Sequence, residues 1–338
     1  MTKPASGAPL DAPLTVVLDA SGSQSLTHAA VDAAARASLD LRINVTLAGD
    51  ERVITRRLTT APSDGERLKV LDATSPEAAR DLATTELGSG RADAWITAAP
   101  PNRVADHVGR RLGTVGSLRQ LALAAIMPTV KKAGDREDPY AIVLDAGAWP
   151  ELAPRDAATL VSLTATLSGW FARGDQVRVG LLVEDPDPAR LTPHQRELDE
   201  ALRPVTNAST RYIGAITPEQ ALLGHADIVA CDGRQGALFL RTLEGAFVAA
   251  EHLVQRETRG LKGRLGIRLF EGRLAKLRDY GNIESYGGWP FVGSAHLVLS
   301  VRHDASANAW FNAIRFARRM QRDGLVDRLQ QGAERPKT

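Results

Sequence analysis

The chain has little cysteine and no long apolar run, and both absences limit what it can be. Cys231 is the single cysteine among 338 residues, which excludes internal disulfides and any metal site built from several cysteines. Since it lies in an apolar segment, we expect a small core residue rather than a nucleophile. No apolar run approaches the roughly 18 residues that read as a membrane-spanning helix, and the N-terminal stretch lacks a signal peptide's apolar segment. We therefore expect a cytoplasmic protein.

An excess of charge of one sign is also missing. The 42 Lys and Arg residues are opposed by 40 Asp and Glu residues, which leaves a net charge of +2. So balanced a composition does not indicate a polyanionic partner such as nucleic acid. No Gly-x-Gly-x-x-Gly fingerprint follows the first predicted strand, and no cluster of metal ligands is visible. The sequence therefore predicts neither a nicotinamide cofactor nor a metal.

Short apolar runs alternate with helical patterns along the chain, and no internal repeat is present. This order is typical of a mostly parallel sheet with helices on both faces, and it predicts a doubly wound, three-layer α/β/α fold. We expect disordered tails at 1–13 and 331–338 around a single α/β domain at 14–330. The predicted strands are 14–18, 42–48, 69–71, 94–97, 121–127, 140–144, 177–183, 211–213, 228–231 and 297–301. The predicted helices are 28–37, 75–88, 155–171, 195–202, 238–254 and 307–318, with a helix or turn at 52–57 and a helix start at 217–220.

The turn after the strand at 228–231 carries the clearest sign of a site. Asp232 and Gly233 break the apolar run, and the turn through Gly236 leads into an amphipathic helix. In an open α/β sheet such a turn lies at the carboxyl end of a strand, where N–H groups of the following helix can hold an anion. The alternative is a turn that needs glycine only for its backbone.

This segment resembles PlsX-type phosphate acyltransferases, which transfer the acyl group of acyl-carrier protein to inorganic phosphate in bacterial phospholipid synthesis. The shared pattern is CDG-x-x-G-x-x-x-x-x-T-x-E-G, which includes Thr242 and Glu244, and a second match, YGGWPFVG, begins at Tyr286. Weaker similarities keep the same order from about residue 15 to residue 318. The resemblance implies a fold like that of isocitrate dehydrogenase or phosphotransacetylase.

The resemblance also implies which residues form the site. Asp232, Arg234 and His303 are the expected catalytic residues, and either Arg302 or His303 takes the place of a histidine of the family. Arg234 and the glycine turn would stabilise the oxyanion, while His303, beside Asp304, would act as a base. The expected substrate-binding residues are Asp19, Gly22, Asn102, Gly147, Gly233, Gly236, Thr242, Glu244, Tyr286, Gly287, Gly288 and Arg302.

Several positions depart from the family's pattern. The acidic residue and the histidine that follow the first strand in the family are replaced by residues such as Gln24, and Trp149 stands in place of an asparagine. Pro100 and Pro101 remove two backbone donors from a loop that would otherwise hold phosphate. A lysine- and serine-rich segment of the family is missing before residue 94. These changes indicate a remodelled anion site.

Two function hypotheses follow. The first is an acyltransferase that takes an acyl thioester, on acyl-carrier protein or coenzyme A, and passes the acyl group to phosphate or another small acceptor in lipid metabolism. The second is a non-catalytic or repurposed homolog, an accessory subunit that binds acyl-carrier protein or a partner acyltransferase. Neither hypothesis calls for a cofactor.

The segment at 257–285 is basic and amphipathic, with apolar residues placed between arginines and lysines. Such a segment can pack against a partner or lie on an anionic membrane, and the pattern favours partner packing. In the resembled family the matching helices lie near the dimer interface and help peripheral membrane attachment. The resemblance therefore implies a homodimer, with 257–278 as the point of peripheral contact with the inner membrane face.

Overall fold

The computed structural model describes residues 13–130, 140–171, 176–258, 260, 287–325 and 328. Its strands are β1 Thr15–Asp19, β2 Asn44–Gly49, β3 Leu68–Asp72, β4 Ala94–Thr97, β5 Ala122–Pro128, β6 Tyr140–Leu144, β7 Val177–Leu182, β8 Thr210–Ile216, β9 Ile228–Ala230, β10 Trp289–Val292 and β11 Leu297–Ser300. Its α-helices are α1 Gln24–Asp40, α2 Glu51–Leu58, α3 Pro76–Gly88, α4 Pro101–Arg111, α5 Pro154–Phe171, α6 Pro193–Leu202, α7 Pro218–Leu222, α8 Gly233–Glu257 and α10 Ala307–Arg322.

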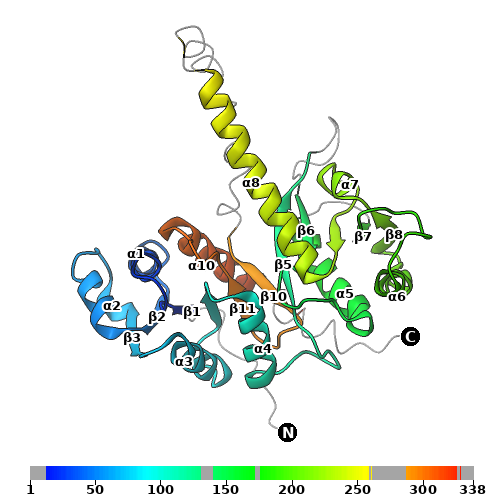
Figure 1. Cartoon of the computed structure of the whole chain (residues 1–338). Coiled ribbons are helices and arrows are strands. Elements are labelled where there is room, and N and C mark those ends of the chain that lie inside the picture. The colour runs from blue at the N-terminus through cyan, green and yellow to red at the C-terminus, as the bar shows by residue number, and fades with distance from the viewer. Residues whose placement is uncertain are drawn as a thin grey trace.

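The strands form one 11-stranded sheet in the order β3-β2-β1-β4-β11-β10-β5-β6-β9-β7-β8 (Figure 1). The strands β3, β2, β1, β4 and β11 are parallel to one another, and so are β6, β9, β7 and β8. Between these groups, β10 is antiparallel to β11 and β5, and β5 is antiparallel to β6. The two parallel groups therefore point in opposite directions along a mostly parallel sheet.

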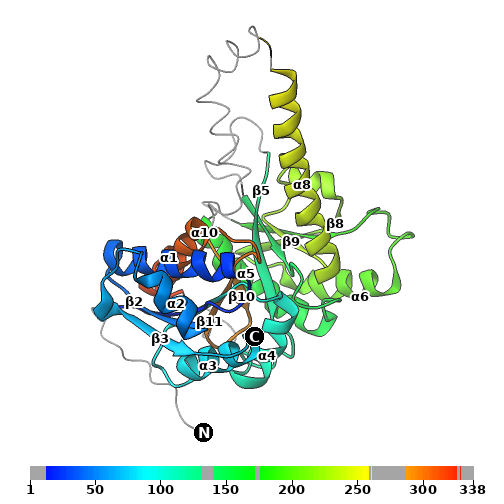
Figure 2. The same ribbon diagram turned by 60° about the vertical axis from the view of Figure 1, so that its left-hand side comes forward.

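Helices cover both faces of the sheet, as the sequence predicts. Because successive side chains of a strand point to opposite faces, Val16 and Leu18 of β1 pack in the same core cluster as Ala30 of α1. Val17 packs in the other cluster, with Val104 of α4. Figure 2 shows α1 and α10 on one side of this part of the sheet and α3 and α4 on the other. The predicted three-layer fold is confirmed.

Local capping explains where several helices begin. Ser23 accepts a hydrogen bond from Leu26 N and starts α1 four residues before the predicted helix. Two elements were not predicted at all: α4, which has Pro101 in its first turn, and β10, a four-residue strand. Proline is favourable at the first helical position, so the prolines of this loop also start a helix.

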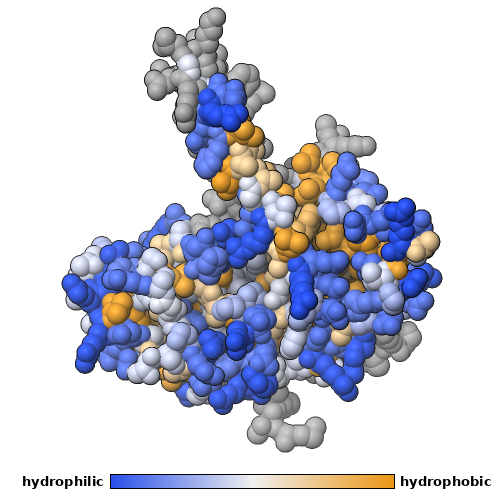
Figure 3. Space-filling model, in the orientation of Figure 1, coloured by the Kyte–Doolittle hydropathy of each residue, from blue (hydrophilic) through white to orange (hydrophobic). Residues whose placement is uncertain are grey.

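The helix α8 differs from the others because most of it projects beyond the sheet (Figures 1 and 2). It has 25 residues, which makes it about 37 Å long. Its buried residues, Gly233, Gly236 and Leu240, all lie in the first turns. Figure 3 shows apolar surface on the projecting part. No helix in the described part of the chain, α8 included, combines the length and hydrophobicity needed to cross a membrane. Most of the predicted basic segment at 257–285 lies outside the described residues.

Candidate functional site

Neighbouring strands β1 and β4 send the chain to opposite faces of the sheet, since β1 leads to α1 and β4 leads to α4. In open α/β sheets, ligands bind in the crevice outside the carboxyl ends of strands that diverge in this way. The last residues of the two strands are Asp19 and Thr97. They mark the candidate site.

Asp19 joins the two loops that leave these strands. Its Oδ1 accepts from the backbone N of Ser21 at 3.1 Å and from the Ser21 hydroxyl, and its Oδ2 accepts from Thr97 Oγ1 at 2.8 Å. The side chain is 2% exposed, and this burial raises the pKa of Asp19 above its usual value, against the effect of these hydrogen bonds. The carboxyl group is therefore held by three donors from its own surroundings.

The loop after β4 offers few backbone donors to a ligand. Pro100 and Pro101 have no N–H group, and the N-cap position of α4 has no side-chain hydrogen bond. Asn102 is exposed, and its side-chain oxygen accepts from Arg103 N at 2.9 Å. On the other loop, Gly22 adopts a φ of 139°, which an L side chain rarely adopts. Side chains must therefore supply most donors at this end of the sheet.

The loop after β11 reaches across to α8. Arg302 donates to both carboxylate oxygens of Asp304, through Nε and Nη2 at 2.8 Å each, and through Nη1 to Glu244 Oε2 at 2.8 Å. The bonds from Arg302 hold the pKa of Asp304 below its usual value. Arg302 and Glu244, both predicted substrate-binding residues, are therefore in direct contact, whereas His303 is exposed to solvent.

At the opposite end of the sheet, the turn at Asp232 is packed against the loop that follows β6. A Cβ added to Gly233 would lie 2.0 Å from Trp149 O, and one added to Gly236 would lie 2.1 Å from Asp145 O. Glycine at both positions lets α8 begin in backbone contact with that loop. The packing supports the alternative in which the turn needs glycine for its backbone, while substrate binding by these glycines remains a prediction.

Asp232 itself is tied to two other segments. Its Oδ1 accepts from Leu152 N at 2.9 Å and lies 3.0 Å from Nε2 of His194, at the start of α6. The side chains of His194 and Asp232 are 27% and 15% exposed. Arg234 is exposed on the first turn of α8. Sequence reasoning missed His194, because the pairing joins residues far apart in the chain.

Beside this turn lies a second buried carboxyl group, Asp145. Asp145 is fully buried with a φ of 61°, and it accepts from Ala148 N at 2.8 Å and from Trp149 N at 3.2 Å. Burial raises its pKa to about 7. Cys231 is also fully buried, and burial raises the pKa of its thiol well above the usual value. Such a thiol is a core group, as expected, and not a nucleophile.

Comparison with known proteins agrees with both the fold and the sequence pattern. A family model described as "Fatty acid synthesis protein" matches residues 14–328. The chain belongs to this family. Among its relatives, phosphate acyltransferase from Shouchella clausii is 25% identical and the alignment covers 95% of this chain and 99% of that protein. Phosphate acyltransferase from Bacillus subtilis is also 25% identical, with 96% and 99% covered. The resemblance to PlsX-type phosphate acyltransferases is therefore confirmed.

Two solved structures share the fold. A branched-chain phosphotransacylase from Enterococcus faecalis aligns with a TM-score of 0.55 at 13% identity, over 91% of this chain and 99% of that one. A phosphotransacetylase from Streptococcus pyogenes aligns with a TM-score of 0.56 at 12% identity, over 96% and 95%. At these identities the likeness concerns the fold alone, and it confirms the predicted phosphotransacetylase-like architecture.

The second family motif has a packing role in this member of the family. Tyr286 lies outside the described residues. Gly287 has a φ of 92°, and a Cβ there would lie 2.9 Å from Phe316 Cβ on α10. A Cβ on Gly288 would lie 3.0 Å from Leu299 Cβ. These glycines let the chain enter β10 close to α10, and substrate binding by them remains a prediction.

Two further predicted residues lie apart from Asp19. Gly147 has a φ of 108° in the loop after β6, where a Cβ would be 3.4 Å from Ala237 Cβ. Thr242 is exposed on α8. The predicted residues thus fall into two groups at opposite ends of the sheet, one around Asp19 and Arg302 and one around Asp232. Within the described ranges, no group of three or more His, Cys, Asp or Glu residues is placed to hold a metal ion.

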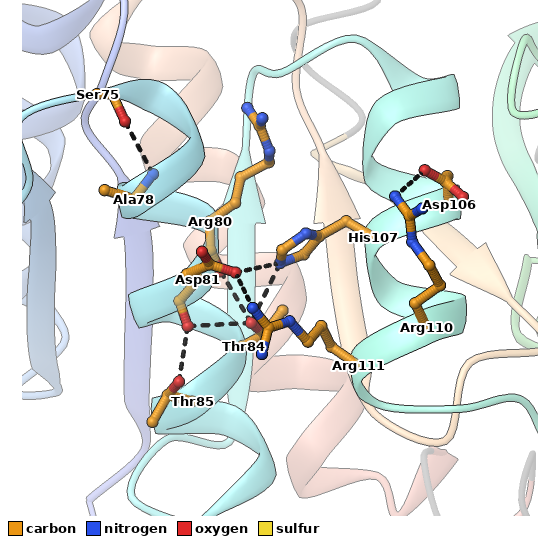
Figure 4. A network of polar contacts seen from close by, with 10 residues as sticks. All are labelled: Ser75, Ala78, Arg80, Asp81, Thr84, Thr85, Asp106, His107, Arg110 and Arg111. Carbon is orange, nitrogen blue, oxygen red and sulfur yellow. Dashed lines mark hydrogen bonds and ion pairs between the residues drawn. The ribbon is translucent and has the colours of Figure 1, made fainter.

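A polar network joins α3 to α4 (Figure 4). Asp81 accepts from Arg111 Nη2 at 2.8 Å and lies 3.7 Å from His107 Nε2, which is 3.2 Å from Thr84 Oγ1. Burial lowers the pKa of His107. Arg80, the residue before Asp81, points away from this network toward the N-terminal ends of α3 and α4. Sequence reasoning missed Arg80 because an arginine on an amphipathic helix usually lies on a solvated face.

Proposed function

We propose that this protein transfers the acyl group of an acyl thioester, carried by acyl-carrier protein or coenzyme A, to phosphate or another small acceptor. The observation that carries this activity is membership of the phosphate acyltransferase family over residues 14–328. The divergence of the chain after β1 and β4, at Asp19 and Thr97, and the Arg302–Glu244 pair in the loop after β11 support it at the level of the fold.

The chemistry requires little covalent work from the protein. An oxygen of the acceptor forms the new bond to the thioester carbonyl carbon, and the carbon–sulfur bond breaks to release the thiolate, which takes up a proton. The acceptor is itself the nucleophile, so the protein needs to hold the two reactants together and to neutralise the charge on the carbonyl oxygen. A buried, unreactive Cys231 is compatible with this scheme.

A second candidate function is an accessory subunit that binds acyl-carrier protein or a partner acyltransferase without turnover. Two observations favour it. Pro100 and Pro101 leave the loop after β4 with few donors. The guanidinium of Arg302 is already held by the carboxylates of Glu244 and Asp304, so its charge is largely compensated within the protein.

The deciding experiment is turnover by the purified full-length protein. Acyl-carrier protein or coenzyme A thioesters of several chain lengths are supplied with phosphate, and acyl phosphate is trapped with hydroxylamine. We expect acyl phosphate from the wild type and less of it from Arg302→Met, while Arg256→Met, an exposed arginine of α8, serves as the matched control. Arg234→Ala tests the predicted role of the Asp232 turn.

Absence of turnover with every thioester would remove the enzymatic activity. Co-purification with acyl-carrier protein under the same conditions would then favour the accessory subunit. If a product that reacts with hydroxylamine forms only when phosphate is supplied, phosphate is instead identified as the acceptor.

We propose further that the protein acts as a homodimer that pairs through α8. Four large apolar side chains of this helix are exposed: Leu238 by 69%, Val248 by 55%, Leu253 by 51% and Val254 by 43%. A second copy of the same helix is a partner with a matching apolar surface. Peripheral membrane contact through 257–278 remains a prediction about a segment mostly outside the described residues.

A further inference from the structure

Arg80 has a buried nitrogen that nothing in the described part of the protein uses. Its Nε is inaccessible to solvent and has no hydrogen-bond partner, and among the described residues Arg80 is the sole charged side chain in that condition. Its guanidinium forms no hydrogen bond or ion pair with another described residue. By contrast, Arg91 and Arg111 each donate to a carboxylate at 2.8 Å.

Two acidic groups, Asp81 and Asp19, do not account for this arginine. Asp81, its neighbour in sequence, contacts Arg111 and His107, and the Arg80 guanidinium points away from these three residues (Figure 4). Asp19 has an electrostatic interaction with Arg80. However, it already accepts three hydrogen bonds from Ser21 and Thr97, and none of its bonds comes from Arg80.

A partly buried guanidinium with an unpartnered nitrogen is costly, because a desolvated charged donor loses its hydrogen bonds to water. In native structures such a group calls for an explanation, and a bound ion is one. Arg80 points toward the N-terminal ends of α3 and α4, and it interacts electrostatically with Asp19, the last residue of β1. At the start of α4, Pro100 and Pro101 provide no N–H. A side-chain cation is therefore the main donor available there.

We infer that Arg80 binds a phosphoryl oxyanion at the carboxyl ends of β1 and β4. The Nη1 and Nη2 groups of a guanidinium are N–H donors in one plane, and as a pair they match two oxygens of a phosphoryl group, while Nε of Arg80 stays buried. The Ser21 hydroxyl, which donates to Asp19, lies at the same end of β1. This assignment rests on the proposed function for the identity of the ligand: either the free phosphate that accepts the acyl group or the phosphoryl group of the thioester donor.

Binding can be measured without turnover. Isothermal titration calorimetry with inorganic phosphate, and separately with coenzyme A, is carried out on the full-length wild type, on Arg80→Met and on Arg91→Met. Arg91 lies at the opposite end of β4 and pairs with Glu86, so its variant removes the same charge elsewhere. We expect at least about tenfold weaker binding for Arg80→Met, since a hydrogen bond to a charged group contributes that much. Arg91→Met should bind as the wild type does.

Each ligand identifies one source. If Arg80→Met loses affinity for inorganic phosphate alone, the acceptor phosphate binds at Arg80. If it loses affinity for coenzyme A alone, the phosphoryl group of the donor binds there. Either result supports the oxyanion site. Unchanged affinity of Arg80→Met for both ligands overturns it. If the wild type makes no acyl phosphate but its phosphate binding depends on Arg80, the site stands and the proposed reaction fails.

A second measurement needs no variant and so does not depend on the folding of Arg80→Met. The wild type is modified with phenylglyoxal, an arginine-specific dicarbonyl, with and without phosphate or coenzyme A, and the modified peptides are identified by mass spectrometry. We expect a bound phosphoryl group to slow modification of Arg80 at least severalfold and to leave Arg91 unchanged. Equal modification of Arg80 with and without both ligands contradicts the inference.

Discussion

Arg302, in the loop after β11, donates through Nη1 to Glu244 Oε2 in α8 at 2.8 Å. The pair joins the carboxyl ends of the first parallel group to the helix that follows β9 of the second group. Its side chains are 28% and 13% exposed. Since β10 and β5 separate the two groups within the sheet, this ion pair is a direct polar link between them.

Removing the charge of Glu244 should destabilise the protein. Glu244→Gln leaves Arg302 with a weaker acceptor in a mostly buried position, so we expect the free energy of unfolding to fall by about 1–3 kcal/mol. Urea denaturation of Glu244→Gln, Arg302→Met and the double variant gives the coupling energy of the pair. The exposed pair Arg256–Glu257, with side chains 63% and 71% exposed, is the matched control and should couple by less than about 1 kcal/mol. Equal coupling in both pairs would contradict the link.

The glycines of the Asp232 turn should be intolerant of any side chain. In Gly236→Ala, a Cβ would lie 2.1 Å from Asp145 O, so either α8 or the loop after β6 must move. We expect a loss of about 3 kcal/mol or more in the free energy of unfolding, measured by chemical denaturation. Gly245→Ala, further along α8, has no atom within 4 Å of its new Cβ. It should raise stability by roughly 0.5–1 kcal/mol through helix propensity alone.

The strand and helix order could be predicted because apolar spacing records which face each residue packs on. The reversal of direction between the two parallel groups could not, because it depends on β10, whose four residues include Pro290 and carry no periodic signal. The helix α4 was missed because Pro100 and Pro101 were interpreted only as residues that remove backbone donors from a phosphate-binding loop, and proline also starts helices.

The candidate site, like the fold, could be predicted only in part from the sequence. The pattern around Gly233 and Gly236 identified the family, yet glycine is required equally by an anion that approaches the backbone and by a backbone that packs against another. Only the contacts with Asp145 and Trp149 distinguish these cases. Arg302 and Glu244 were both predicted site residues, but no spacing in the sequence indicated that they form a pair. Arg80 could be identified only from the structure, in which its buried Nε has no hydrogen-bond partner among the described residues.

Stability should depend on pH through Asp145. Burial raises the pKa of Asp145 from 3.8 to about 7, so the folded state binds this proton more tightly than the unfolded chain. The associated stability is fully present below about pH 4 and is lost as the pH rises through about 7. We expect the free energy of unfolding of the wild type, relative to Asp145→Asn, to fall by about 1–4 kcal/mol across that range.

Asparagine suits this test because it tolerates the φ of 61° that Asp145 adopts and does not titrate. It keeps one acceptor oxygen and loses the other, so a constant offset in stability is expected at every pH. Urea denaturation at pH 4, 5.5, 7 and 8 separates that offset from the slope. Parallel pH profiles for the two proteins would show that Asp145 does not control the dependence.

The exposed apolar residues of α8 should decide the oligomeric state. Leu253→Asp places a charge at a residue that is 51% exposed in one chain and, in the proposed dimer, buried against the second copy. We expect sedimentation equilibrium to find a dimer for the wild type and a dissociation constant raised at least about tenfold for Leu253→Asp. Leu39→Asp, on α1, is the matched control because Leu39 is 46% exposed on a helix outside the proposed interface. A monomeric wild type at tens of micromolar, or equal weakening by both variants, would remove α8 as the pairing surface.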